Sequence, residues 1–268
     1  FICGIKDIIN LITGLGSVFS SKDQKISIFT IIVKIVYNVL FRTINQKVIF
    51  QNEDDKKVLL YHYFQYKAKF FVVNGSGVST KEYTPNPFPR QKVILFVGRM
   101  IYEKGIDSFI KSAIQINQIR HDIKFVLVGP LDFGNPSAIN EEEIKRWTKN
   151  SNIEYWGEKE SMNEIYRQAS IVVLPSIREG FPKIIMEAGL SGRPVIATNV
   201  PGCKNAVIDG VTGYLIPFND HNQMSDKILN LIDDVIKMES FGMRGNDYIK
   251  KNFSEDVIIP EYLKIFES

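Results

Sequence analysis

The sequence of 268 residues is long enough for one large domain or two smaller ones, and its 44% apolar and 24% charged residues are ordinary for a soluble globular protein. Its two cysteines, Cys3 and Cys203, provide no disulfide framework, and its three scattered histidines have no second ligand at metal spacing. Composition therefore argues against a disulfide-rich secreted domain and against a zinc site, and a reducing cytosol is the simplest location.

The formal net charge of +3 is spread unevenly along the chain. Residues 1–92 contain 13 Lys and Arg against 6 Asp and Glu, whereas residues 93–268 contain 20 against 24. A basic first third suits an anionic membrane surface or a nucleic acid, and a solvated lysine-rich surface would have the same composition. No secretory signal is visible from Phe1 onward.

Residues 1–80 predict part of a parallel sheet. Apolar runs indicate strands at 8–13, 47–52 and 70–75, with helices at 26–44 and 53–68. This is about half of a Rossmann-like sheet, and half a sheet leaves an edge without a partner. We therefore expect that an earlier portion of the native protein is absent from this sequence.

Segment 26–44 is apolar enough to raise the question of a transmembrane helix. Lys34 at its centre and Arg42 near its end argue against a span, because a charge at bilayer depth costs roughly 2.5–3.5 kcal/mol or more. The segment is better interpreted as a buried or half-buried helix whose exposed side could lie on a membrane.

Residues 93–268 predict a second and larger parallel sheet. The expected strands are 93–98, 124–129, 153–156, 171–175, 194–198 and 213–217, and the expected helices are 105–119, 140–149, 161–169, 182–191 and 221–238. Apolar strands that alternate with helices indicate a sheet covered on both faces, and right-handed crossovers make it doubly wound. Ligands of such a sheet bind outside the carboxyl ends of its strands.

The predicted fold class is therefore α/β, with two Rossmann-like parts. Segment 75–91, rich in Gly and Pro, is the best interdomain linker. We predict a partial N-terminal domain at 1–80 and a ligand-binding domain at 81–252. A break at Lys251–Asn252 precedes a final helix, within 253–268, that we expect to pack back on the first domain.

The first candidate site follows strand 93–98. Gly98 permits close backbone approach, and the helix that opens at Lys104 and Gly105 offers free N–H groups to an anion. Arg99 can hold phosphate oxygens in a fork, and Lys104 adds a second positive charge. Together they could neutralise a diphosphate without a metal. The alternative is a surface Arg and Lys beside a turn.

The stronger candidate site follows strand 171–175, between Glu179 and Glu187. Pro182 fits the first position of a helix, where its missing N–H has no partner to lose. Glu179 then lies in the loop at the crevice, and Glu187 lies about 7 Å along the helix at 1.5 Å per residue. Two carboxylates so separated can hold hydroxyls at opposite ends of a diphosphate-linked ligand. Either residue alone is as well explained by a helix-start charge or a solvated side chain.

These segments resemble the donor domain of glycosyltransferase family 4. The matching motifs are Gly98-Arg99 with Lys104-Gly105, the Glu-x₇-Glu pattern at 179–187, and Gly202-Cys203 followed by Asp209-Gly210 and the segment 213–217. The resemblance covers nearly all of 93–268, with the motifs in the family's order. It implies the GT-B fold, in which two Rossmann-like domains enclose an active cleft.

The resemblance also implies a role for each residue. Arg99 and Lys104 would bind the donor diphosphate, Glu179 the sugar hydroxyls and Glu187 the ribose hydroxyls. The other donor-binding residues would be Gly98, Gly129, Pro130, Gly157, Glu158, Gly180, Phe181 and Pro182. The family retains the anomeric configuration and needs no divalent metal or other cofactor. No Asp-x-Asp motif occurs here, and Glu53-Asp54-Asp55 fits a helix start.

The first third is similar to one branch of the family. The matching segments are residues 13–19, residues 48–52 with Asp54-Asp55, and residues 74–78. That branch contains bacterial enzymes that build capsule, O-antigen or N-linked glycans on a polyprenyl-diphosphate carrier from UDP-sugars. The implied partners are a nucleotide-sugar donor and a lipid-linked glycan acceptor. The protein would also contact the inner face of the cytoplasmic membrane peripherally, and no nucleic-acid partner is implied.

Two residues depart from the family pattern. Leu15 stands where many members have a histidine, so we assign no general base. Asn205 stands where relatives often carry Glu, which leaves the contacts of that loop open.

Other functions fit parts of the sequence. A nucleotide-sugar epimerase of GT-B-like fold would use the same donor, and a fragment that lacks its acceptor strands would bind donor without transfer. A nucleic-acid-binding surface would explain the basic first third, but no basic and aromatic stacking motif accompanies it. A dinucleotide enzyme is disfavoured because no Gly-x-Gly-x-x-Gly follows a strand.

Overall fold

The computed structural model describes residues 8–16, 19, 28–60, 65–149 and 151–268. Its larger sheet consists of β4 (Lys92–Val97), β5 (Ile123–Val128), β6 (Ile153–Gly157), β7 (Ile171–Leu174), β8 (Val195–Thr198) and β9 (Gly213–Ile216). The strand order is β6-β5-β4-β7-β8-β9, and every pair is parallel. The order reverses between β4 and β7, which makes the sheet doubly wound.

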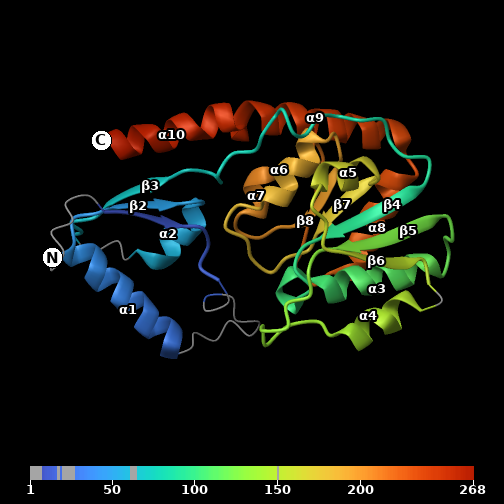
Figure 1. The fold of residues 1–268 in the computed structure, drawn as a ribbon, viewed down its shortest axis with the longest axis horizontal. Coiled ribbons are helices and arrows are strands. Elements are labelled where there is room, and N and C mark those ends of the chain that lie inside the picture. The colour runs from blue at the N-terminus through green and yellow to red at the C-terminus, as the bar shows by residue number, and fades with distance from the viewer. Residues whose placement is uncertain (1–7, 17–18, 20–27, 61–64, 150) are drawn as a thin grey trace.

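Helices cover both faces of this sheet (Figure 1). In β4, Val93, Leu95 and Val97 belong to one buried cluster, and Ile94 and Phe96 belong to another, because successive side chains of a strand point to opposite faces. The first cluster includes residues of α5 (Met162–Arg167), α6 (Lys183–Leu190), α7 (Cys203–Ala206) and part of α9 (Val235–Phe253). The second includes residues of α3 (Ile106–Asn117), α4 (Glu141–Thr148) and α8 (His221–Ile232).

A smaller parallel sheet precedes the larger one, in the order β1-β2-β3. Its strands are β1 (Ile9–Ile12), β2 (Lys47–Phe50) and β3 (Lys69–Val72), and its helices are α1 (Ile28–Thr43) and α2 (Glu53–Leu59). Phe41 of α1 and Leu59 of α2 are buried with Val48 and Phe50 of β2. The predicted α/β class, with a doubly wound sheet and a second partial one, is confirmed.

The last helix, α10 (Glu255–Glu267), lies along the smaller sheet although it follows the larger one in the chain (Figure 1). Lys47 Nζ donates to the carbonyl oxygen of Ile265 at 2.8 Å, and the Tyr262 hydroxyl donates to that of Gly75 at 2.8 Å. These bonds tie the chain's end to β2 and to the segment after β3.

Helix α1 presents an apolar face to solvent. Its buried residues are Thr30, Asn38 and Phe41, which lie on the side toward the sheet. The residues on the other side are exposed and apolar: Ile28, Phe29, Ile31, Ile32, Ile35, Val36, Val39 and Leu40. Among the described residues, no helix has both the length and the hydropathy that crossing a bilayer requires.

Three predicted boundaries were wrong: the ends of two helices and the break before the last helix. The helix expected at 53–68 ends at Leu59, because Leu60 is extended, and Lys67 and Ala68 donate to the carbonyl oxygen of Phe41 instead of continuing a helix. Residues 61–64 of that prediction lie outside the described residues.

The helix expected at 221–238 is interrupted after Ile232. The Asp234 side chain accepts a hydrogen bond from the Lys237 amide at 3.0 Å and thereby caps a new helix, α9. That helix runs through Lys251 and Asn252, so the break before the last helix falls at Ser254, whose backbone is extended.

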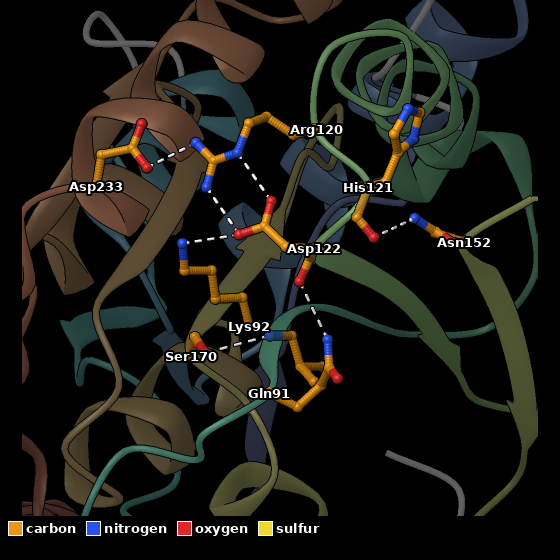
Figure 2. Close-up of polar contacts among 9 residues, drawn as sticks. Gln91, Lys92, Arg120, His121, Asp122, Asn152, Ser170 and Asp233 are labelled. Carbon is orange, nitrogen blue, oxygen red and sulfur yellow. Dashed lines mark hydrogen bonds and ion pairs between the residues drawn. The ribbon is translucent and has the colours of Figure 1, made fainter.

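An ion-pair network joins the amino ends of β4 and β5 to the turn between α8 and α9 (Figure 2). Asp122, just before β5, accepts from Arg120 and from Lys92 at the start of β4, and Arg120 also binds Asp233 between α8 and α9. This network is at the end of the sheet opposite the carboxyl ends.

Candidate active site

A pocket of about 440 Å³ lies between the two sheets, at the carboxyl ends of β4 and β7. The strand order reverses between these two strands, and this is the place where doubly wound sheets bind ligands. The loop after β1 forms another wall. The lining residues are Thr13, Gly14, Leu15, Gly16, Arg99, Ile101, Glu103, Lys104, Asn135, Ile177, Arg178, Glu179 and Gly180.

Lys104 and Glu179 form an ion pair in the wall of this pocket. Lys104 ends a single 3₁₀ turn, Tyr102–Lys104, that precedes α3, and its Nζ is 2.6 Å from Oε1 of Glu179. The side chains are 19% and 13% exposed, so the pair is largely shielded from solvent. Charges shielded in this way interact more strongly than charges in water. The pair offers an ammonium group to an anion and a carboxylate to hydroxyl groups.

Arg99 borders the same pocket from the loop after β4. Its Nη1 is 2.7 Å from Oδ2 of Asp132, and its side chain is 55% exposed. A guanidinium carries five N–H donors, of which this bond uses one. Arg99 and Lys104 therefore place two positive charges on one pocket, which suits a diphosphate.

Two glycines permit the close approaches that shape the pocket. A Cβ on Gly180 would lie 1.6 Å from the carbonyl oxygen of Thr13, so this position brings the loop after β7 against the loop after β1. Gly105 has a φ of +74° and a Cβ there would lie 2.0 Å from the carbonyl oxygen of Pro175. Both positions exclude a side chain, and Gly105 also needs a left-handed backbone.

Gly98, Gly129 and Gly157 end or follow β4, β5 and β6 at the same edge of the sheet, but outside the lining of the pocket. Gly98 donates its N–H to Val128 and Gly129 donates to Gly157, each at 2.9 Å. The neighbouring Pro130 accepts from the Met100 amide at 2.9 Å, and Glu158 is exposed. These residues form a connected row of strand ends beside Arg99.

Glu187 is not brought into the pocket with the other three charged residues. It lies on α6, is 6% exposed, and accepts a hydrogen bond from the Tyr166 hydroxyl at 2.9 Å. Lys183 Nζ is 3.5 Å from its other oxygen. Burial raises the pKa of Tyr166 well above its usual value, and the charge of Glu187 adds to this shift.

Phe181 and Pro182 also take structural positions. The Phe181 ring is buried against Phe253 at the end of α9, with ring centroids 4.9 Å apart. The expectation that Pro182 is the first helical residue was wrong by one position. Its ψ of 112° is extended, so it caps α6, which begins at Lys183.

No three His, Cys, Asp or Glu side chains among the described residues form a group that could hold a metal ion. Cys203 is buried in α7, and burial raises the pKa of its thiol, with a further contribution from Glu179. Cys3 lies outside the described residues.

Sequence reasoning missed two contributors to this region. Asp55 was expected as a helix-start charge in a segment similar to one branch of the family, and it does lie in the first turn of α2, where its amide donates to the Asn52 side chain at 2.7 Å. Asp55 also forms an ion pair with Arg178, a lining residue that no motif indicated. No signal in the linear sequence couples residues so far apart.

Comparisons with known proteins agree with this geometry. A family model described as "Glycosyl transferases group 1" matches residues 91–234. An N,N'-diacetylbacillosaminyl-diphospho-undecaprenol alpha-1,3-N-acetylgalactosaminyltransferase of Campylobacter jejuni is 25% identical over 96% of this chain and 69% of its own length. The capsular polysaccharide biosynthesis glycosyltransferase CapM of Staphylococcus aureus is 30% identical over 66% of this chain and 46% of its own length. The chain thus spans between about half and two thirds of these relatives.

Solved structures show the same fold. TarM superposes with a TM-score of 0.80 at 23% identity, over 97% of this chain and 50% of its own. Anabaena HepE, solved in complex with UDP-glucose, superposes with a TM-score of 0.81 at 18% identity, over 98% of this chain and 72% of its own. The fold is therefore of the GT-B type that the sequence predicted.

Proposed function

The chain belongs to the family of glycosyl transferases group 1, and we propose that it transfers a sugar from a UDP-sugar to a lipid-linked glycan during the assembly of a bacterial surface polysaccharide. The observation that carries this proposal is the pocket at the β4–β7 switch point, where Arg99 and Lys104 supply positive charge beside the Glu179 carboxylate. A nucleoside diphosphate linked to a sugar needs both kinds of group.

Each charged residue has a proposed task. Negative charge grows on the diphosphate as it leaves the sugar, and Arg99 and Lys104 stabilise that charge from the wall of the pocket. Glu179 accepts hydrogen bonds from sugar hydroxyls and fixes the sugar's orientation. These two cations do the work that a divalent metal does in other transferases, which is why we propose a reaction without a metal or other cofactor.

We further propose that the sugar keeps its anomeric configuration, as in glycosyltransferase family 4. The bond from the anomeric carbon to the diphosphate oxygen breaks, and a bond to the acceptor oxygen forms on the same face. The departing phosphate accepts the proton of the acceptor hydroxyl. This scheme needs no side-chain base, and Leu15, which lines the pocket, has no titratable group to supply one.

The remaining predicted donor contacts stay proposals. Gly98, Gly129, Pro130, Gly157 and Glu158 lie along the strand ends where the nucleotide would extend from the diphosphate. Gly180, Phe181 and Pro182 would approach the phosphates and sugar through their backbone. Glu187 would hold the ribose hydroxyls through its oxygen Oε1, which lies 3.5 Å from Lys183 Nζ and has room for further hydrogen bonds.

The donor and acceptor classes rest on the relatives. Their names and titles give diphospho-undecaprenol for the Campylobacter enzyme and UDP-glucose for HepE. We therefore assign residues 81–252 to the donor and residues 1–80 to the acceptor, with 253–268 joining the two parts.

We also propose that the protein works at the inner face of the cytoplasmic membrane. The exposed apolar face of α1 belongs to the part of the chain with excess Lys and Arg. An apolar helix face combined with positive charge is typical of helices that lie in the interface of an anionic bilayer. A lipid-linked acceptor would be presented at that interface.

Calorimetric titration with UDP-, GDP- and ADP-sugars, followed by transfer assays on polyprenyl-diphosphate-linked acceptors, tests the proposal. We expect saturable binding of a UDP-sugar and a glycosylated product with the donor's anomeric configuration. Release of a free or epimerised sugar without any acceptor would favour the epimerase alternative, and no binding of any nucleotide sugar would contradict the proposal.

A further inference from the structure

The loop that carries Glu179 is held on both sides of this residue by the N-terminal part of the chain. Arg178 forms an ion pair with Asp55 of α2. The Asn52 side chain donates a hydrogen bond to the carbonyl oxygen of Gly180 at 2.7 Å. The two residues that flank Glu179 are therefore anchored across the interface between the sheets.

The pair of Asp55 and Arg178 is deeply buried. Asp55 is 0% exposed and the Arg178 side chain is 15% exposed. Among the described residues, Oδ2 of Asp55 and Nε of Arg178 have no hydrogen-bond partner. Burying two charges with incomplete hydrogen bonding is a poor way to gain stability, because desolvation offsets the attraction. The pair is better explained by what it holds in place.

The backbone around Glu179 is confined as well. A Cβ on Gly180 would lie 1.6 Å from the carbonyl oxygen of Thr13, and a Cβ on Gly202 would lie 2.6 Å from that of Glu179. The loop is thus enclosed between the segment after β1, the start of α2 and the turn before α7. Within this enclosure the Glu179 carboxylate points to Lys104.

We infer that Asp55 and Arg178 are positioning residues for the transfer reaction, which hold the Glu179 carboxylate in the orientation that the sugar requires. The inference rests on the proposed function, because it concerns the residue that would orient the sugar. Asp55 is the more informative member of the pair, since it does not line the pocket and cannot contact the donor through it.

A matched control crosses the same interface. Asp54, the neighbour of Asp55, forms an ion pair with Lys204 at 2.9 Å, and these side chains are 30% and 39% exposed. This pair joins α2 to α7, which covers the larger sheet, but it does not flank Glu179. If the ion pairs only held the two parts together, both pairs would affect the reaction alike.

Steady-state transfer kinetics of the full-length protein test the inference. In Asp55→Asn we expect kcat to fall about 10- to 100-fold while the KM for the UDP-sugar stays within about threefold, because a misplaced group costs more in the transition state than in the ground state. Asp54→Asn and Lys204→Gln should stay within about twofold of wild type. In the double variant, which combines Asp55→Asn with Arg178→Gln, kcat should be no lower than in the slower of these two single variants.

Hydrogen exchange supplies a readout that does not depend on transfer. The amides of residues 177–181 should exchange faster in Asp55→Asn than in wild type, and should be unchanged in Asp54→Asn. If Asp55→Asn fails to fold, the double variant takes its place in both measurements, because the double variant removes both charges of the pair and leaves neither one buried alone.

The outcomes separate the two claims. If the wild type transfers sugar and Asp55→Asn matches it in kcat, or if Asp54→Asn loses as much activity, the positioning role is overturned and the proposed function stands. If the wild type does not transfer sugar from any donor tested, the proposed function fails. Independently of transfer, amide exchange at 177–181 that is the same in Asp55→Asn as in wild type would overturn the anchoring role of Asp55.

Discussion

At the scale of single residues, charge and position together give the site its character. Lys104 and Glu179 are 75 positions apart in the sequence but 2.6 Å apart at their charged atoms. Arg99 and Lys104 could be predicted as a group, because both follow one strand. Their meeting with Glu179 could be predicted only through the rule that strand ends at a switch point share one crevice.

Asp122 provides a pH prediction at this scale (Figure 2). Hydrogen bonds from Arg120 and Lys92 lower the pKa of its carboxyl group. A lowered carboxyl pKa means that ionised Asp122 stabilises the fold above the unfolded value of about 3.9, and that this stability is lost as the pH falls through the folded value. Its side chain is 50% exposed, so the contribution is about 1 kcal/mol or less.

The measurement is the thermal midpoint of wild type and Asp122→Asn between pH 7 and pH 2. The variant should melt at a lower temperature at pH 7, and the difference should shrink progressively below about pH 4, where the unfolded chain takes up the Asp122 proton before the folded protein does. A difference that stays constant over the whole range would contradict the assigned cause.

At the scale of elements, the glycine that precedes α3, Gly105, allows a prediction about the stability of a variant. Gly105→Ala should lower the free energy of unfolding by about 3 kcal/mol or more, because it adds a clash with Pro175 to the strain of a left-handed backbone. Gly210→Ala is the matched control. Gly210 has a φ of +71° but nothing within 4 Å of its added Cβ, so roughly 1 kcal/mol is expected.

Chemical denaturation of the two variants checks this prediction. Equal losses for Gly105→Ala and Gly210→Ala would show that the Pro175 contact relaxes freely and that backbone strain alone requires the glycine.

The sequence predicted most elements of the larger sheet because its strands are short apolar runs with helices between them. It failed where one side chain decides a boundary. Asp234 ends one helix and begins another by accepting a bond from Lys237, which periodicity cannot distinguish from a solvated acid. Leu60 leaves the helix because the chain after α2 turns back to Phe41, a contact made through tertiary structure.

At the scale of the whole molecule, the exposed face of α1 predicts binding to lipid. Ile35→Asp places a charge in the middle of that face, where Ile35 is 52% exposed. Binding to vesicles that contain anionic lipid should weaken about tenfold, because an isoleucine no longer buries its side chain and a carboxylate is repelled. Ile236→Asp is the control, since Ile236 on α9 is 83% exposed and apart from α1.

Vesicle co-sedimentation of both variants and the wild type gives the answer. If Ile35→Asp binds as well as wild type, α1 is not the membrane contact. If Ile236→Asp weakens binding equally, the loss reflects charge in general and says nothing about α1.

The relation between the two sheets is what the sequence could not predict. Asp55 and Arg178 lie in separate parts of the chain, and nothing in their local patterns indicates that they meet. The same holds for Thr13 and Gly180, which line the pocket and approach each other closely there. Strand-end rules locate residues within one sheet, whereas contacts between sheets depend on how the two parts pack.

Glu179→Ala and Lys104→Ala in the full-length enzyme test the central claim that this pocket holds the donor during transfer. With a UDP-sugar and a lipid-linked acceptor, the turnover number of each variant should fall by about 100-fold or more, with an unchanged circular dichroism spectrum and with Glu142→Ala, an exposed residue of α4, remaining at wild-type activity. Near-normal turnover by folded Glu179→Ala would remove the pocket's carboxylate from the reaction and contradict the account.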